Sequence, residues 1–450
     1  MTEFLSAAVD IVWGLPLVIF LFAANLVLLV QSRFRPLLRT FHGLKLLGGG
    51  DEKKDGEGIS HFKTFSNAMA ATIGMGNISG VAIAVSQGGP GTVFWMWVAS
   101  VFGMNTKFFE CTAALLERGH DYRGKHVGGA MYTLPRILGD KGKPLAYLFA
   151  VCGLIGTLSM FQINQLSGFM STQYAIPGWG SGLFFSGLTL WILRGGLPRL
   201  SNACALIVPF MGLLYTVICL VVLGMYWERL PAVFSLILRH AWDPKAAAYG
   251  TALYTFVHVM VTGIKRATFS NEAGLGTAPM AHSDTSSTEP VAEGYVAMLG
   301  PLIDTILGCT LTALVVLVVF PQGAPALSGI QLSIAAFEIP LGEWGRHLLG
   351  VCVLLFAYAT ILGMANYNQK CWDFIFKGHL GDGAYQGWYA LTIFAGAVLA
   401  AQNVLNIIDI AYALMTIPNI VATLMLAPRV KAAMADYDRR KLNERKNSSA

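Results

Sequence analysis

The chain has 450 residues, of which 55% are hydrophobic and only 12% are charged. Soluble proteins carry about 25% charged residues, so this composition excludes a water-soluble enzyme, a disordered scaffold and a nucleic-acid binder. The formal net charge is +6 and the mean hydropathy is +0.57, and together with the 49 glycines these values predict a protein that crosses a membrane many times.

About 20 consecutive apolar residues cross a bilayer, and this length predicts eleven transmembrane helices. In chain order they cover residues 11–32, 64–87, 92–116, 145–172, 180–196, 202–226, 248–282, 292–320, 346–376, 384–402 and 405–427. The first is expected to be retained, because Glu3 and Asp10 precede or begin it where a cleaved signal peptide would be basic. The short basic run 229–242 is predicted to be an interfacial helix.

Lysine and arginine concentrate in alternate connections, chiefly 33–63, 117–144 and the tail 428–450. The connections between them, such as 88–91 and 321–345, carry none. The positive-inside rule therefore places the N-terminus outside and the basic C-terminal tail in the cytoplasm, where it would face anionic lipid.

Two of the spans are too polar and too rich in glycine to be smooth helices. The second contains AATIGMGNISG (70–80), and the seventh contains KRATFSNEAGLG (265–276). Charged and amide groups at membrane depth must face protein or water, and glycine weakens a helix and releases main-chain groups. Both segments are therefore predicted to be discontinuous helices.

The two broken spans lie five spans apart. Units of five helices alternate in orientation, so residues 64–226 and 248–427 are predicted to form an inverted five-plus-five repeat, with 11–32 as an addition. We expect one membrane transport domain over 1–450. Broken helices at matching places in two halves indicate a transporter binding site, and their half-helix ends suit the carboxylate and ammonium of a zwitterion.

Polar residues inside otherwise apolar spans extend this prediction. Gln162, Asn164 and Gln165 are interpreted as lining a wet cavity, although such amides also bond neighbouring helices. Thr360 either bonds its own helix or binds sodium.

Three acidic residues inside the spans are possible ion or gating carboxylates. They are Glu110, Glu272 and Asp304. For Glu272 a structural pair with Lys265 or Arg266, or a gate, is the favoured interpretation. Asp304 is left open between a helix cap and an ion ligand.

The sequence offers no support for catalysis or a resident cofactor. It contains no HExxH, GxSxG or Cys/His cluster, and its seven cysteines form no CxxC pair. The segment 119–125 has most of a phosphate-binding loop, but His126 replaces its Ser or Thr and a membrane helix precedes it. An enzyme is therefore not expected.

At these residues the chain resembles the alanine or glycine–sodium symporter family of bacteria and archaea. The resemblance rests on ATIGMGNISGVAIAVSQGGPGTVFWMW (71–97), FSNEAGLGTAPMAH (269–282) and FAYATILG (356–363), and it extends over almost the whole chain. It implies an all-α, leucine-transporter-like fold of ten core helices plus one in a cytoplasmic membrane. It also implies sodium-driven uptake of a small neutral amino acid such as alanine or glycine.

The resemblance also implies the site residues. Substrate contacts would come from Thr72, Gly74, Met75, Gly76, Asn77, Gln162, Asn164, Phe269, Ser270, Asn271 and Met364. Sodium would be bound by Ala70, Ile73, Asn77, Ala359 and Thr360. Three positions depart from the family pattern: Ala359 replaces a Ser or Thr, Met364 often a Trp, and Met75 a smaller or branched residue. We therefore expect a reshaped pocket whose preferred solute need not be alanine and could be glycine, serine or even glutamine.

Two other functions remain open from the sequence. A proton-coupled carrier of the same fold would titrate Asp304, Glu110 or Glu272 in place of binding sodium. A channel or a non-transporting sensor would bind the solute without accumulating it.

Overall fold

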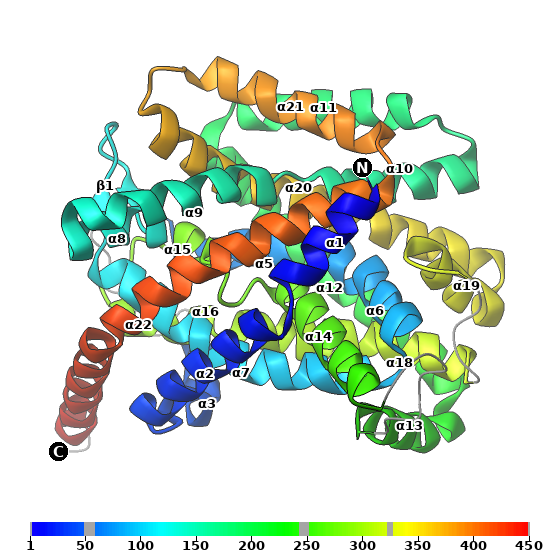
Figure 1. The fold of residues 1–450 in the computed structure, drawn as a ribbon, viewed down its shortest axis with the longest axis horizontal. Coiled ribbons are helices and arrows are strands. Elements are labelled where there is room, and N and C mark those ends of the chain that lie inside the picture. Colours follow the sequence, from blue (N-terminus) through cyan, green and yellow to red (C-terminus); the bar gives the residue numbers. More distant parts are fainter. Residues whose placement is uncertain (1, 49–58, 243–251, 322–326, 449–450) are drawn as a thin grey trace.

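Helices make up nearly all of the chain, which the computed structural model describes over residues 2–48, 59–242, 252–321 and 327–448. They pack side by side into one bundle (Figure 1). The first part of the chain contains α1 Thr2–Val12, α2 Leu15–Ser32, α3 Arg35–Leu38, α4 Thr40–Leu47, α5 His61–Thr72, the π-helical turn η1 Gly76–Gly80, α6 Val81–Gly88 and α7 Gly91–Leu116.

A short hairpin and a run of helices follow. They are β1 Gly119–His120, β2 His126–Val127, α8 Ala130–Leu138, η2 Gly139–Gly142, α9 Lys143–Gly156, α10 Met160–Tyr174, α11 Gly178–Leu193, α12 Gly196–Met225, η3 Trp227–Arg229 and α13 Leu230–Trp242. The two strands are antiparallel, with Gly119 opposite Val127. The predicted interfacial helix 229–242 is present as η3 and α13.

The remaining elements are again helical. They are α14 Ala252–Asn271, α15 Thr277–His282, α16 Pro290–Ala297, α17 Leu299–Pro301, the π-helical η4 Leu302–Cys309, α18 Thr310–Val319, α19 Ile330–Leu341, α20 Glu343–Phe376, α21 Asp382–Val398 and α22 Ala401–Ser448.

Among the described residues, six helices are long and apolar enough to cross a membrane. A seventh span results if α5 and the segment Gly76–Gly88, bent by 48° to each other, are counted as one. The protein is therefore an all-helical membrane protein with several apolar spans. The count of eleven crossings, their orientation and the inverted repeat stay predictions.

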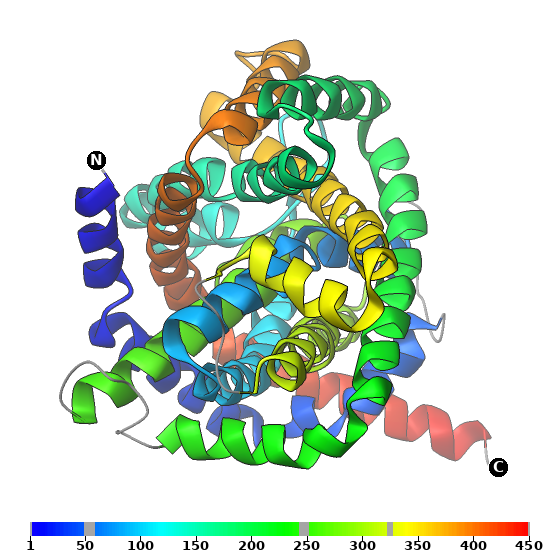
Figure 2. The same cartoon turned by 90° about the vertical axis from the view of Figure 1, so that its right-hand side faces the viewer.

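The broken helix α5–η1–α6 lies at the centre of the bundle. Almost every residue from 64 to 85 is buried, because α7, α12, α14 and α20 all contact this helix. Figure 2 shows it (blue) enclosed by the other helices. The polar, glycine-rich segment of the sequence is thus also buried at the centre of the fold, and the candidate site lies there.

A third interruption, which the sequence did not reveal, divides the predicted span 145–172. α9 ends at Gly156 and α10 begins at Met160. Thr157 donates to the carbonyl of Gly153 at 2.7 Å, and Asn368 on α20 donates to Leu154 O at 2.8 Å and to Thr157 Oγ1 at 3.0 Å. These side chains satisfy groups that the broken helix leaves free.

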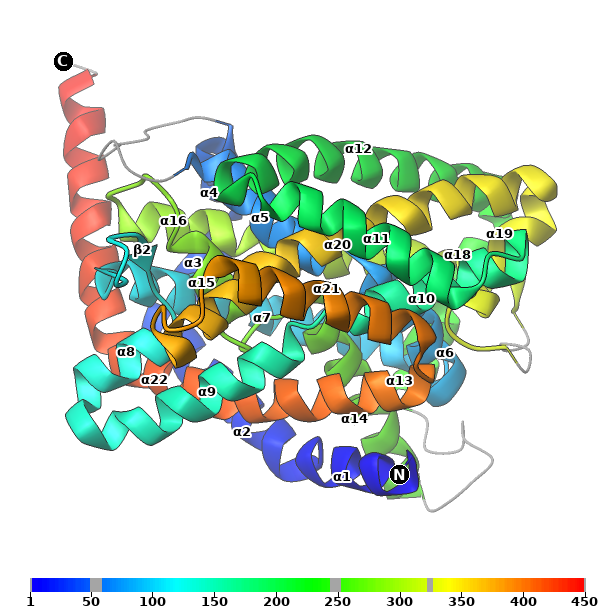
Figure 3. The ribbon, with the colours of Figure 1, turned by 90° about the horizontal axis from the view of Figure 1, so that it is seen from above.

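The two ends of the chain contact each other. Trp13, between α1 and α2, donates its indole N–H to the main-chain oxygen of Asp409 on α22 at 2.8 Å. The basic tail continues α22 as a helix to Ser448, which Figure 3 shows projecting from the bundle. Its Asp438 pairs with Arg35 and Arg39, so the tail is tied to the segment after α2.

Candidate substrate and sodium site

The first break is the run Ile73-Gly74-Met75 between α5 and η1. Ile73 adopts extended backbone angles, which leaves main-chain groups at the end of α5 without helical partners. Gly74 is required by packing, because a Cβ there would overlap Oγ1 of Thr360 on α20. Asn77 Oδ1 accepts from the Gly74 N–H at 3.0 Å and closes the turn.

The second break covers residues 272–276, between α14 and α15. Glu272, Gly274 and Gly276 have φ values of 56°, 84° and 82°. Glycine adopts this region freely, whereas Glu272 needs support from its surroundings. Thr277 Oγ1 donates to Glu272 Oε2 at 2.6 Å, and Asn419 on α22 donates to Gly274 O at 2.9 Å.

The segments beside the two breaks lie in contact. A Cβ on Gly76 would lie 3.3 Å from Cα of Ser270 and 3.5 Å from the ring of Phe269. The small residue at 76 therefore allows the first broken helix to approach the last turn of α14. The predicted residues Gly76, Phe269 and Ser270 share one place in the fold.

A buried carboxylate, Asp304 on η4, joins the two broken helices. Asn77 Nδ2 donates to Asp304 Oδ1 at 2.8 Å, and Ser270 Oγ donates to Asp304 Oδ2 at 2.9 Å. Thr305 Oγ1 donates to the same Oδ2 at 2.7 Å, and Asn271 Nδ2 donates to Thr305 Oγ1 at 3.0 Å. The two oxygens of Asp304 and the hydroxyl oxygens of Ser270 and Thr305 thus form a cluster of oxygen atoms that suits a hard cation.

A second group of oxygens lies where α5 meets α20. Thr360 Oγ1 lies 3.3 Å from the carbonyl oxygen of Ile73 and 3.0 Å from that of Phe356. Ala70 and Ala359 are fully buried beside it. Both interpretations of Thr360 remain compatible with these distances, since its hydroxyl reaches its own helix and the break.

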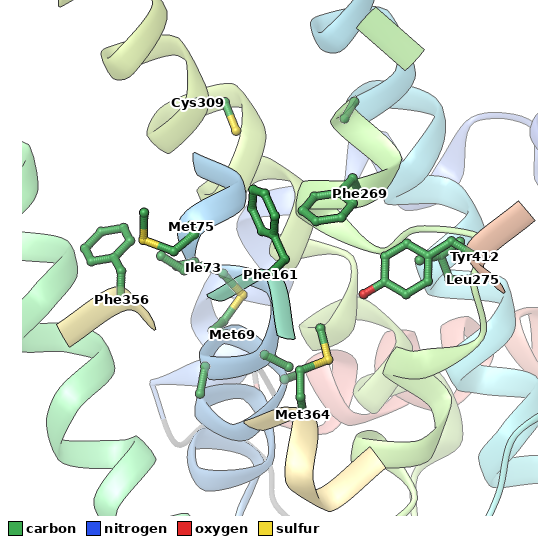
Figure 4. Packing of buried hydrophobic residues seen from close by; sticks show 14 of the residues in the cluster. Met69, Ile73, Met75, Phe161, Phe269, Leu275, Cys309, Phe356, Met364 and Tyr412 are labelled. Atoms are coloured by element: carbon green, nitrogen blue, oxygen red, sulfur yellow. The ribbon is translucent and has the colours of Figure 1, made fainter. Parts of the chain in front are cut away.

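The walls near the breaks are aromatic and sulfur-containing. The ring of Phe269 contacts that of Phe161 on α10 at 5.1 Å between centroids and that of Tyr412 on α22 at 5.7 Å. Figure 4 shows Met75 and Met364 among these side chains, with the Tyr412 hydroxyl directed toward the region of Met364. Met75 and Met364 are buried.

The remaining predicted residues differ in their surroundings. Gln162 is buried and its Oε1 has no partner among the described residues, so it can accept a further hydrogen bond. Asn164 instead donates to the carbonyls of Gly396 and Leu399, which attaches α10 to α21. Thr72 donates back to Ala68 O at 3.1 Å within α5.

The favoured pairing of Glu272 with Lys265 or Arg266 is wrong. Arg266 pairs with the buried Asp409 on α22, and Lys265 lies 3.9 Å from the same carboxylate. The positive φ of Glu272 ends α14, and its side chain bonds to Thr277 on the far side of the turn. Asn419 links Glu110 to the second break, because it donates to Glu110 Oε2 at 2.7 Å and to Gly274 O at 2.9 Å.

Two cavities open near the site and differ in charge. The amide-lined cavity, of about 330 Å³, has no charged residue in the described part of its lining; its polar side chains are those of Gln87, Asn164, Gln165, Ser328, Gln331 and Gln402. Phe161 also lines it, next to Phe269. The charged cavity, of about 170 Å³, reaches Asp284 and Lys370 and is bordered by the hairpin that contains Arg123.

Sequence reasoning missed several residues of this region. They are Lys107, Thr305, Asp409, Tyr412 and Asn419. Polar residues at membrane depth were the available signal for Lys107, Asp409 and Asn419. Thr305 and Tyr412 carry no such signal, because threonine and tyrosine are ordinary in membrane helices.

Comparison with known proteins agrees with this architecture. The relatives include the sodium/alanine symporter AgcS of Methanococcus maripaludis, which is 34% identical over 447 residues and 97% of each chain. The probable sodium/glutamine symporter GlnT of Bacillus subtilis is 30% identical and covers 96% of this chain and 90% of its own. The fold resembles that of MhsT, solved with L-phenylalanine, with a TM-score of 0.53 at 15% identity over 84% and 89% of the two chains.

The decisive match is to a family profile that covers residues 1–450. Members of this family are transporters, and the glycine-rich breaks, the joining carboxylate and the lack of catalytic motifs all agree with it. The chain belongs to the sodium:alanine symporter family.

Proposed function

We propose that this protein imports a small neutral amino acid, such as alanine or glycine, together with sodium by alternating access. The observation that carries the proposal is the position of Asp304, whose two carboxylate oxygens accept from Asn77 beside the first break and from Ser270 beside the second. A cation at this carboxylate would contact both broken helices at once. Binding of the ion would therefore order the two halves of the site together.

The substrate would lie between the breaks. Its carboxylate would be bound by the main-chain N–H groups of Met75 and Gly76, where a helix N-terminus favours negative charge. The N–H groups of Gly74 and Asn77 already donate within the break. Its ammonium would be accepted by the unpartnered Oε1 of Gln162. Phe161, Phe269 and Met364 would surround the side chain and limit its size.

Sodium has two candidate positions in this proposal. One is the carbonyl oxygen of Ile73 with Thr360 Oγ1, next to Ala70 and Ala359. The other is Asp304 with the hydroxyl oxygens of Ser270 and Thr305. Because Ala359 supplies no side-chain oxygen to the first position, the charged second position is the stronger candidate.

Alternating access would connect the site to one cavity at a time. The hairpin β1–β2 borders the charged cavity and lies in the basic connection 117–144, so the positive-inside rule assigns that cavity to the cytoplasm. The amide-lined cavity would then face outside, where it admits a net-neutral solute. In the described structure Lys370 pairs with Asp284 in the lining of the charged cavity.

The energy available is adequate for one sodium per solute. Moving one charge through 100 mV contributes about 2.3 kcal/mol. A tenfold sodium gradient adds about 1.4 kcal/mol. Their sum is enough to concentrate a neutral solute on the order of 500-fold.

The test is uptake of labelled alanine into proteoliposomes with and without an inward sodium gradient. Accumulation that requires sodium and collapses with the gradient is expected. If uptake is driven only by an acid exterior, the coupling ion is a proton and not sodium. Binding without accumulation would indicate a sensor or a channel.

The preferred amino acid is tested by competition with unlabelled glycine, serine, alanine and glutamine. We expect Met364→Trp to shift the ranking toward the smaller solutes, because the bulkier ring occupies part of the wall near Phe269. An unchanged ranking would remove Met364 from the specificity-determining wall.

A further inference from the structure

The six buried carboxylates of the described structure are not equally provided with counter-ions. They are Glu110, Glu272, Asp284, Glu293, Asp304 and Asp409. Three have their own cationic or ring-nitrogen partner in direct contact: Lys370 for Asp284, Arg266 for Asp409, and His61 with His282 for Glu293. The other three, Glu110, Glu272 and Asp304, have only neutral hydrogen-bond donors.

One buried cation remains for these three acids. Lys107 on α7 is 2% exposed, and it interacts electrostatically with Glu110, Glu272 and Asp304. Among the residues that the structure describes, no carboxylate oxygen lies within the 4.0 Å of an ion pair from its ammonium. An unpaired buried charge is unfavourable, so this arrangement favours the binding of another positive charge.

The ammonium lies against Gly300, which is on the same span as Asp304. A Cβ on Gly300 would lie 3.3 Å from Nζ and 3.7 Å from Cδ of Lys107, so the missing side chain at 300 provides its space. Gly300 precedes Asp304 by four residues, about one helical turn, and residues with this spacing lie on one helix face. A short movement of the flexible lysine chain would therefore bring Nζ to the Asp304 carboxylate.

We infer that Lys107 is a tethered counter-ion that takes the place of the transported cation beside Asp304 after that cation leaves. This inference rests on the proposed function. It assigns to Lys107 the step in which the protein, with neither sodium nor solute bound, returns to its outward-facing state. Without Lys107, the unloaded protein would rearrange around an uncompensated buried carboxylate. With sodium bound, Asp304 is neutralised and Lys107 stays beside Gly300.

Two assays distinguish a counter-ion from a purely structural residue. Net uptake requires the unloaded protein to return to its outward-facing state. Exchange of internal for external alanine at high sodium does not require that step. For Lys107→Met we expect net uptake into empty vesicles to fall at least tenfold, while exchange stays within about threefold of the unmodified protein. The half-saturating sodium concentration should fall, because a competing cation has been removed. The exposed Lys143→Met is the matched control and should change neither rate.

Parallel loss of net uptake and exchange, or no change in either, would overturn the inference. If Lys107→Met fails to fold, Lys107→Met with Glu272→Gln removes one charge of each sign and should restore the folded protein. That double variant must still lose net uptake selectively. If the unmodified protein itself shows no sodium-dependent uptake, the proposed function fails first, and the tethered counter-ion fails with it.

Discussion

Asn77 donates its side-chain amide to both the carboxylate and the main-chain oxygen of Asp304, at 2.8 and 2.9 Å. Asn77 Oδ1 meanwhile accepts from the main chain of Gly74, so one side chain links the first break to the carboxylate on η4. Any ion that draws on the oxygens of Asp304 must therefore change the contacts of the break. This is a direct structural basis for coupling between cation and solute.

Asp304→Asn keeps the shape of this side chain and removes its charge. We expect the half-saturating sodium concentration to rise at least tenfold, which corresponds to at least about 1.4 kcal/mol of cation binding. Sodium titration of alanine uptake measures the change. Asp436→Asn, an exposed acid on α22, is the control. A sodium dependence that is unaltered in Asp304→Asn would place the coupling ion elsewhere.

Gly74 and Gly80 provide a matched pair of substitutions in neighbouring turns. A Cβ on Gly74 would overlap Thr360 Oγ1, whereas a Cβ on Gly80 would meet only Met75 O, at 3.8 Å. Gly74→Ala should therefore reduce sodium-driven uptake at least tenfold, and Gly80→Ala should leave it within about twofold. Equal effects of the two substitutions would show that helix propensity, rather than the contact with Thr360, sets the tolerance.

The sequence alone predicts the helix breaks of this site but not the contacts between different spans. Glycine, asparagine and serine at membrane depth predict breaks from the chain alone, because few other structures tolerate them there. The approach of Gly76 to Ser270 agrees with that prediction. The partners of Asp304 could not be assigned, because they lie on three different spans whose packing the sequence does not specify.

Two errors of sequence reasoning have specific physical causes. Counting helical turns from Arg266 suggested Glu272 as its partner, but α14 ends at Asn271 and the left-handed backbone of Glu272 redirects its side chain. The interruption at 157–159 contains no glycine or proline. It persists because Asn368, on a distant span, bonds to Leu154 O and Thr157 Oγ1.

The ion pair between Arg266 and Asp409 should stabilise the fold because the two charges neutralise each other, and not because their side chains fill a particular volume. Arg266 Nε and Nη1 have no hydrogen-bond partners among the described residues, so Asp409 and the Phe269 ring, 5.2 Å from Cζ, are what stabilise the guanidinium there. Asp409→Asn should destabilise the protein by about 3–5 kcal/mol, because it leaves a buried charge without its partner. The apparent melting temperature of the purified protein in detergent is the measurement.

A double substitution identifies the cause of that destabilisation. Arg266→Met with Asp409→Leu removes both charges while retaining apolar volume, and it should recover most of the lost melting temperature. If the double variant melts no higher than Asp409→Asn, the loss reflects the specific hydrogen-bond geometry of the pair, and the charge argument fails.

The contact between Lys370 and Asp284 should control access from the charged cavity. Lys370 Nζ lies 2.6 Å from Asp284 Oδ1 and 2.5 Å from Met280 O, and Asn366 donates to Asp284 Oδ2 at 3.0 Å. α20 is thereby attached to the end of α15 and the loop that follows it. Asp284→Asn weakens this closure, so conformations open toward the charged cavity should become more populated.

Cys309 reports on that opening, because its Sγ lies 3.3 Å from Ser270 Oγ beside Asp304 and is fully buried. With Cys309 as the sole cysteine, Asp284→Asn should increase at least fivefold the rate of its modification by an impermeant thiol reagent in inside-out vesicles. A fivefold change corresponds to about 1 kcal/mol in the closed–open equilibrium. Asp436→Asn in the same background should leave the rate unchanged. If the reagent is equally slow with Asp284→Asn, other contacts hold this side of the site closed.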